Sequence, residues 1–467
     1  MTNSRNPTYL LLLSIPLFLA SCYSAREYVR PEEEIVTARY FRSDSLSQDS
    51  ASLALVSWKE LFTDPYLQDY IEEGLENNID IRIAIQQIRI TETYLQQARL
   101  LNRPTVDGTL QYSRSELSKN SQFGAQFSTL NQYQLSGTVA WEADVWDRIS
   151  STQRAQRALY LQSVAAHTAV KSRLIANIAS TYFDLLSLDE QRRITEQTIV
   201  NRQNSLETTR ALKEAGNVTE VGVKQTEAQI FTARAILIDI NNNIHLLENA
   251  LSLLLGSDLR DFPRSTLAEQ RTTSKLTTGV PAQLLANRPD VIAAEYGLIN
   301  AFELVNVARA DFYPSLTLSA TVGLQSLTLG KFLDPSSFFA TLVGGAVRPL
   351  IDGRRIRTQY AVSELQREQA TLDFRSTVLT AAREVSDALY TYAAACEKIE
   401  VKEQELAAYD LATEYSEELL VNGYANYLEV LRARENTLNT SLDLVNARNT
   451  RLQSVVNLYE ALGGGWQ

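Results

Sequence analysis

The sequence predicts a mainly α-helical protein with a small β part, built as an internally duplicated chain. Three observations predict this fold class. The second half repeats the first, two stretches free of Pro and Gly are far longer than a globular core needs, and four short segments alternate apolar and polar residues. Each half is therefore expected to contribute long coiled-coil helices and two strands.

The duplication is visible without gaps. Residues 80–104 align to 290–314, and residues 215–229 align to 422–436 at an offset of 207. The joint between the halves is polar and carries two prolines, which is typical of a linker. The sequence therefore divides into a signal segment, a lead-in segment, a first repeat, a linker or equatorial region and a second repeat, at 1–21, 22–57, 58–256, 257–283 and 284–467.

Four segments have the period of two expected of strands. In 133–145 the residues Tyr133, Leu135, Val139 and Trp141 fall on one face, and Gln134 and Thr138 fall on the other. Strands are expected at about 104–146 in the first half and about 314–351 in the second. A sheet covering a core and an outer-membrane barrel share this pattern, but four strands cannot close a barrel, so a barrel requires several chains.

The helices are predicted from their length and spacing. Ile149 to Lys213 contains neither Pro nor Gly, so its 65 residues can form a helix of about 97 Å. The hairpins of long and returning helices are expected at about 149–255 and about 354–462. Apolar residues of the returning helices step by three and four, which indicates coiled-coil packing.

The N-terminus is read as a lipoprotein signal. Arg5 precedes the apolar run 9–20, and the run is too short to span a membrane. The following Leu19-Ala20-Ser21-Cys22 resembles a lipobox, in which the cysteine is acylated and becomes the new N-terminus. Tyr23 in place of Asp implies export to the outer membrane.

Composition excludes several function classes. The net charge is −11, so nucleic acid is not an expected partner. The chain has two cysteines and two histidines, and we find no second metal-ligand type next to His167 or His245 in the sequence. No catalytic residue, metal or cofactor is therefore expected apart from the covalent lipid on Cys22, and the protein is not expected to be an enzyme.

Several motifs carry a family resemblance. The segments "WEADVWDR" (141–148), "LLANRPDVIAAE" (284–295) and "FYPSLTLSATVG" (312–323) resemble the TolC-like outer membrane factors, in their efflux lipoprotein branch of the NodT type. The resemblance implies a trimer, with a 12-stranded outer-membrane β-barrel on a 12-helix periplasmic α-barrel. It further implies a passive exit duct for substrates delivered by an inner-membrane RND-type pump through a periplasmic adaptor, the membrane fusion protein.

The resemblance also assigns residues at the helical turns. Gly216 and Gly423 stand where each long helix turns back, and the family places its periplasmic tips there. In "GYANYLEVLRA" (423–433) the positions Leu428, Glu429 and Arg432 match the family's closed aperture. Arg432 replaces an acidic residue, and at i,i+3 it can neutralise Glu429.

Two alternatives stay open at this point. Type I protein secretion uses a similar channel, whereas the lipobox and the RPDVxxAE pattern favour efflux. A coiled-coil stalk lipoprotein without a pore would explain the helices and Cys22, but not four alternating strands.

Overall fold

The computed structural model describes residues 25–30, 56–122, 124–126, 129–270, 288–425 and 427–464. Their contacts divide them into two compact units. The strand unit holds described residues up to 30 together with 89–162 and 294–374. The helical unit holds described residues of 31–88, 163–293 and 375–467. Cys22 and the signal segment lie outside the described residues.

The elements follow the order expected from the duplication. The helices are α2 (Trp58–Leu61), α3 (Pro65–Asn77), α4 (Ile79–Leu100), α5 (Arg148–Glu214), α6 (Glu220–Leu255), α8 (Pro289–Ala310), α9 (Arg355–Val421) and α10 (Tyr427–Ala461). The strands are β1 (Thr105–Glu116), β2 (Thr129–Ala143), β3 (Ser315–Ser326) and β4 (Phe338–Val347), and short 3₁₀ turns are η4 (Leu267–Glu269), η5 (Leu329–Lys331) and η6 (Pro335–Ser337). The predicted mainly helical, four-stranded fold class is confirmed.

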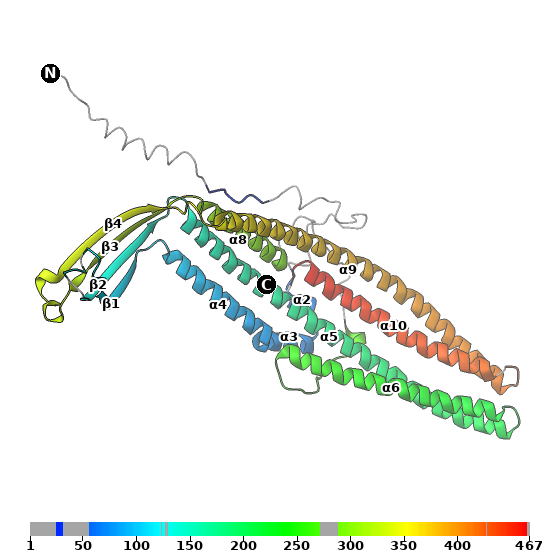
Figure 1. Ribbon diagram of the computed structural model, residues 1–467. Helices are drawn as coiled ribbons and strands as arrows, with labels where there is room; N and C mark the ends of the chain where they lie inside the picture. The colour runs from blue at the N-terminus through cyan, green and yellow to red at the C-terminus, as the bar shows by residue number, and fades with distance from the viewer. Residues whose placement is uncertain are drawn as a thin grey trace, which may run out of the picture. The chain divides into compact units, whose positions relative to one another are not determined.

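The four strands of the strand unit form one antiparallel sheet in the order β1-β2-β3-β4 (Figure 1). The register joins the two halves of the duplication through β2 and β3, where Leu135 pairs with Leu324. No described strand pairs with the outer edge of β1 or of β4. The sheet is therefore open on both sides within one chain.

The register aligns a row of apolar residues from all four strands on one face, although β4 also places Phe339, Val343 and Val347 on the other. Leu110, Leu135, Leu324 and Phe338 form one continuous row across the sheet. Leu110 is 79% exposed and Phe338 is 62% exposed, so no core formed by described residues covers this face. The opposite face carries rows of Gln and Thr, and the hydroxyls of Thr138 and Thr321 lie 3.0 Å apart. The interpretation of the strands as a sheet over a core is therefore wrong for this chain.

Each strand pair leads into its long helix through left-handed backbone, which in the second half also includes Gly353 with φ 61°. Asp147 has φ 57° and Arg354 has φ 68°, and these positions are 207 residues apart, the offset of the repeat. A carboxylate then caps the first turn: Asp144 accepts from the amide of Ile149 at 2.8 Å, and Asp352 accepts from that of Ile356 at 3.0 Å. The duplicated sequence thus folds into duplicated junctions.

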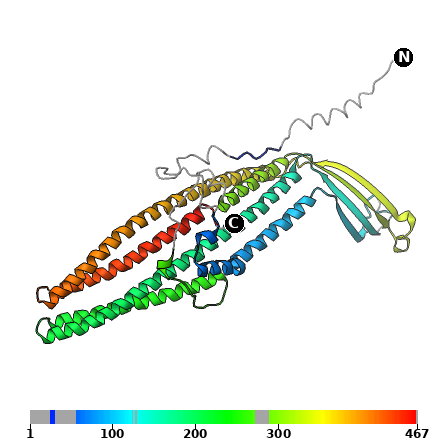
Figure 2. The ribbon, with the colours of Figure 1, turned by 180° about the vertical axis from the view of Figure 1, so that it is seen from behind.

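Two helical hairpins make up most of the helical unit. In both views α5 runs beside α6 and α9 runs beside α10 (Figures 1 and 2). One side of α10 faces α9, where Arg434 and Glu417 pair at 2.6 Å. Another side faces α5, where Asn449 donates to Asp184 at 2.7 Å. Packed neighbours on two sides of α10 agree with the coiled-coil packing expected from its heptad pattern.

The core of the helical unit gathers residues from both halves of the chain. Leu67, Ile71, Tyr182, Leu251 and Leu458 are fully buried in it. Tyr182 donates to Asp64 at 2.7 Å, so this core also contains a satisfied polar pair.

Helix α8 is the one described helix that is long and apolar enough to cross a membrane by length and composition. Only 33% of its most apolar window is buried within the chain. Most of its other residues are half-buried, and Leu304 at 39% is its only exposed large apolar side chain.

The element limits differ from the predicted ones at two strands. β2 begins at Thr129, four residues before the alternation noted from Tyr133, because its extra residues pair with the extended end of β1. β4 ends at Val347 rather than at about 351. Pro349 has no amide hydrogen to donate, so it cannot continue the ladder.

Candidate functional site: the helical tips and their supports

The first tip, residues 215–219, joins α5 to α6 around Gly216. Gly216 has φ 83°, and its amide donates to the carbonyl of Lys213 at 2.9 Å. The amide of Asn217 donates to the carbonyl of Leu212 at 2.9 Å. These two bonds form a Schellman motif, which requires the left-handed backbone that glycine adopts most readily.

The second tip, at residues 422–425, repeats this geometry around Gly423. Gly423 has φ 79°, and the amide of Tyr424 donates to the carbonyl of Leu419 at 2.8 Å. A Cβ at either glycine would meet no atom within 4 Å. The backbone angle, and not crowding, therefore demands glycine at both predicted tip positions.

A buried contact joins the starts of the two returning helices. The hydroxyl of Tyr427 on α10 hydrogen-bonds the hydroxyl of Thr226 on α6, and both residues are buried. A Cβ at Gly222 would lie 3.3 Å from the Tyr427 ring, so this glycine makes room for it. The sequence analysis missed Thr226 and Tyr427. The only signal for them was an aromatic residue directly before Leu428.

Leu428, Glu429 and Arg432 lie together on the exposed face of the first turns of α10. Leu428 is 45% exposed, and both charged residues are exposed. The opposite face carries Tyr427 and Val430, which are buried. The structure therefore brings the three residues expected at the aperture onto one surface.

The pairing considered for Glu429 with Arg432 is not formed. Within the described part of the chain, neither side chain makes an ion pair. Arg434, two residues further along, turns to the other side and pairs with Glu417. Both charges of the aperture surface therefore stay available to ions.

A buried arginine lies on α5 about four turns before the first tip. Arg202 of α5 is 4% exposed, and its Nη1 donates to the carbonyl of Gln229 at 2.6 Å. Its Nε has no hydrogen-bond partner among the described residues. Burial lowers the pKa of Arg202, and the charge of Glu435 acts in the opposite direction. This arginine borders a polar groove that is also lined by Thr198, Glu417 and Arg434.

The RPD motif is a structural clamp in the helical unit. Arg288 is 6% exposed and donates to both carboxylate oxygens of Asp290, at 3.0 and 2.6 Å. It also donates to the carbonyl of Ala461 at 2.9 Å and pairs with Glu384 at 2.8 Å. Burial alone would raise the pKa of Asp290, but the hydrogen bond and charge of Arg288 lower it overall. The motif thus fixes the start of α8 against α9 and the end of α10.

The aromatic motifs join strand ends in the strand unit. The indole of Trp146 donates to the carbonyl of Pro314 at 2.7 Å and stacks on Tyr313 at 4.8 Å. Arg148 forms an ion pair with Glu142 at 2.7 Å. The WEADVWDR and FYPSL segments therefore meet where β2 ends and β3 begins.

The short N-terminal segment 25–30 docks on α8 within the strand unit. The amide of Asn306 donates to the carbonyl of Arg26 at 3.0 Å, and Arg30 pairs with Glu295 at 3.1 Å. The rings of Tyr28 and Phe302 make an edge contact at 5.7 Å. Sequence reasoning could not find this docking, because its partners are about 280 residues apart along the chain.

One cluster of possible metal ligands was also missed. His245, Glu248 and Asp261 of the helical unit lie close together. His245 and Glu248 are one turn apart on α6, but Asp261 follows in the linker and is brought in by the fold.

The chain matches one protein family over most of its length and several named proteins over nearly all of it. The sequence profile described as outer membrane efflux protein matches residues 70–257 and 280–464. The solvent efflux pump outer membrane protein SrpC of Pseudomonas putida is 28% identical over 462 residues, covering 97% of this chain and 98% of that protein. The cation efflux system protein CusC of Escherichia coli is 27% identical over 465 residues, covering 99% and 100%. The probable outer membrane lipoprotein SilC of Salmonella typhimurium is 25% identical over 460 residues, covering 98% of each.

Solved structures share the fold. A crystal structure of CusC superposes with a TM-score of 0.82 at 25% identity, covering 95% of this chain and all of that one. The open-state outer membrane channel MtrE of Neisseria gonorrhoeae superposes with a TM-score of 0.83 at 24% identity, covering 96% and 99%. With the family profile matched over most of its length, the chain belongs to the outer membrane efflux protein family.

Proposed function

We propose that this outer-membrane efflux channel works as a passive exit duct assembled from three copies of the chain. The observation that carries the proposal is the open four-stranded sheet, apolar and exposed on one face and polar on the other. Such a sheet is unstable in water, since it exposes large apolar side chains and unpaired backbone groups. It suits a barrel wall with lipid outside and water inside.

The number of strands per chain favours three copies over two in the assembled barrel. Two chains would supply eight strands, and an eight-stranded barrel has an interior that side chains fill. Three chains supply twelve strands, which leaves room for a conducting lumen. Twelve is also the number that the family resemblance implies.

The exposed apolar residues of α6 favour a ring of several chains. Five large apolar residues on α6 are between 57% and 73% exposed: Val221, Phe231, Ile238, Leu246 and Leu253. Their spacing of seven to ten residues places them along one side of the helix. On α9, Tyr390, Val401 and Tyr415 are exposed as well. A head-to-tail interface between α6 of one copy and α9 of the next buries both surfaces and closes a ring.

The lipid anchor fits the docked N-terminal segment. Cys22 precedes the docked residue Arg26 by four residues, which span at most about 14 Å. Asn306, which holds Arg26, lies one turn before the end of α8 and shortly before β3 begins. Acylation of Cys22 would therefore place the acyl chains close to the membrane end of the strand unit.

The aperture and the partners complete the proposal. Three copies of Leu428, Glu429 and Arg432 would ring the periplasmic entrance, and a periplasmic adaptor would join it to an RND-type inner-membrane pump. The chain itself supplies no energy, and the pump selects the substrate. Relatives named for solvent, toluene and cation efflux favour small-molecule efflux over protein secretion.

Planar-bilayer recording of the purified protein tests this function. A closed or low-conductance channel is expected, and replacing Leu428 and Glu429 together by Ser should raise the conductance because the aperture loses its apolar and charged ring. A protein that inserts no channel at all, while remaining folded, would contradict the proposal.

A further inference from the structure

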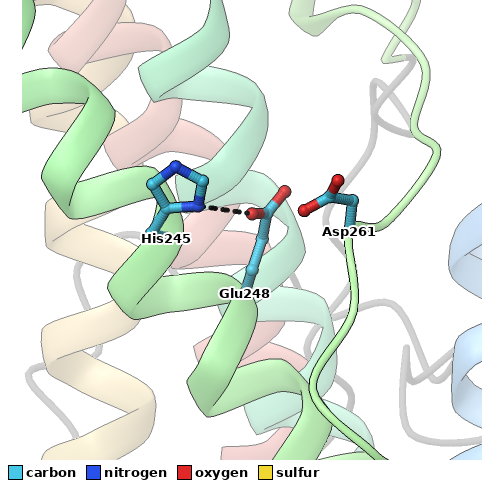
Figure 3. A group of neighbouring side chains, drawn as sticks. All are labelled: His245, Glu248 and Asp261. Atoms are coloured by element: carbon cyan, nitrogen blue, oxygen red, sulfur yellow. Dashed lines mark ion pairs between the residues drawn. The ribbon is translucent and has the colours of Figure 1, made fainter.

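His245, Glu248 and Asp261 form a compact group of three different ligand side chains in the helical unit (Figure 3). Their ligand atoms all lie within 4.8 Å of one another, and the Nδ1 atom of His245 is 3.5 Å from one carboxylate oxygen of Glu248. His245 is 74% exposed on its side chain, whereas the Glu248 side chain is only 8% exposed. Glu248 therefore anchors the group within the protein, and His245 opens it to solvent.

The neighbouring arginine holds Glu248 but leaves part of the group unpaired. Arg264 donates to the other oxygen of Glu248 at 2.7 Å and also binds Asp189. Burial alone would lower the pKa of Arg264, but its two carboxylate partners raise it above the ordinary value, so it stays charged. Asp261, in contrast, has no hydrogen bond or ion pair with any described residue. The two carboxylates of Glu248 and Asp261 and the imidazole of His245 therefore lie close together. The nearby positive charge of Arg264 is shared with Asp189.

The duplicated half carries no ligand side chains at the equivalent helix positions. The positions equivalent to His245 and Glu248 at the offset of 207 are Leu452 and Val455 of α10, and both are 3% exposed. The first half therefore carries a ligand pair where the second half carries ordinary core residues. A buried carboxylate is unfavourable unless it is compensated, and this one faces both an arginine and two further ligands.

We propose that His245, Glu248 and Asp261 bind one divalent first-row transition-metal ion per chain, such as Zn²⁺. One imidazole nitrogen and two carboxylate oxygens suit borderline and hard divalent ions, and the site offers no sulfur ligand for soft monovalent ions. Water would complete the coordination on the exposed side of His245. Arg264 acts as the supporting group, because it fixes the Glu248 carboxylate with one oxygen directed to the site.

The ion would fasten the segment 257–265 to α6. This segment is already held on both sides of Asp261: Arg260 pairs with Glu73, the Tyr70 hydroxyl donates to the carbonyl of Pro263 at 2.6 Å, and Arg264 pairs with Glu248 of α6 at 2.7 Å. Asp261 is the position between them whose side chain has no described partner. Metal binding would add an attachment through Asp261 and is independent of conduction through the pore.

Isothermal titration of Zn²⁺ into full-length, chelator-stripped protein in detergent tests the site, in a Cys396→Ser background that removes the one described free thiol. We expect one Zn²⁺ per chain. His245→Leu, which copies the residue of the second half, and Asp261→Asn should each weaken binding by about tenfold or more. The matched control His167→Gln, at the only other histidine, should keep the affinity.

A second readout separates metal binding from a structural effect. Zn²⁺ should raise the thermal unfolding temperature of the unsubstituted protein and should leave that of folded His245→Leu unchanged. No Zn²⁺ binding by the unsubstituted protein at micromolar concentration, or equal binding by His245→Leu and His167→Gln, would overturn the proposal.

Discussion

Arg288 is a buried guanidinium that holds three segments of the helical unit together. Removing it would leave Glu384 and the carbonyl of Ala461 without this cation and would leave Asp290 with only the backbone amide of Val291 as a described hydrogen-bond partner. Arg288→Ala should therefore destabilise the protein by about 3–5 kcal/mol. Thermal unfolding in detergent measures this, with Arg383→Ala as control because the Arg383–Asp387 pair is exposed and 3.9 Å long. Equal unfolding temperatures for the two variants would contradict the clamp.

The same clamp gives a prediction for pH. Arg288 lowers the pKa of Asp290 in the folded protein below the ordinary value of about 3.9. The pair therefore contributes its full stability above about pH 4, and this contribution is lost as the pH falls through the folded pKa. Unfolding temperatures recorded down to about pH 3 should fall more steeply for the unsubstituted protein than for Arg288→Ala. If the unfolding temperatures of both proteins fall equally with pH, the Arg288–Asp290 pair does not contribute to the loss of stability in acid.

At the proposed aperture, the exposed charges set the expected ion preference. Glu429 and Arg432 are exposed and unpaired with each other, so each would contribute its own field at the proposed entrance. Arg432→Ala should shift the reversal potential of the purified channel toward cations, and Glu429→Gln should shift it toward anions. Glu403→Gln is the control, since Glu403 pairs with Arg448 on an exposed helix face away from the tips. Unchanged selectivity in both aperture variants would place the selective constriction elsewhere.

At the scale of elements, the tips depend on left-handed glycines. Gly423→Ala keeps the open space around the residue but strains its φ of 79°, which should destabilise the second tip by about 1 kcal/mol. Limited proteolysis at the tip should become faster, whereas Gly330→Ala, also in open space but without a positive φ, should have no such effect.

The strands give a matched pair of substitutions on neighbouring residues. Leu342 belongs to the apolar face of β4 and is 73% exposed, while Thr341 belongs to the polar face. Leu342→Lys places a charge against lipid, at an expected cost of about 2–4 kcal/mol near the middle of the bilayer, and should reduce assembly in the outer membrane. Thr341→Lys faces water and should assemble normally. Equal assembly of both variants would contradict the assignment of the two faces.

The elements were largely predictable from the sequence, because their patterns are local. The stretch from Ile149 to Lys213 lacks helix breakers, and the alternation in 133–145 fixes which residues share a face. The clamp of Arg288 on Ala461 and the approach of Asp261 to His245 were not predictable. They join positions that no periodic pattern relates, so only the packing of the helices brings them together.

At the scale of the whole molecule, one chain leaves two kinds of surface unpaired: the outer sheet edges and an apolar helix face. The outer edges of β1 and β4 have unpaired backbone groups, and α6 exposes a row of large apolar residues. Each edge is complementary to its counterpart on another copy, so a closed ring satisfies both at once.

Disulfide trapping between the two sheet edges tests this ring most directly. In a Cys396→Ser background, one cysteine replaces Leu110 in β1 and a second replaces Ala340, Leu342 or Gly344 in β4. Within a chain these strands are separated by two others, or about 14 Å, which is too far for a disulfide. We expect at least one pair to yield a covalent species of three chains that grows no further on complete oxidation. Chains that remain single, or a ladder extending beyond three, would contradict a barrel pooled from three copies.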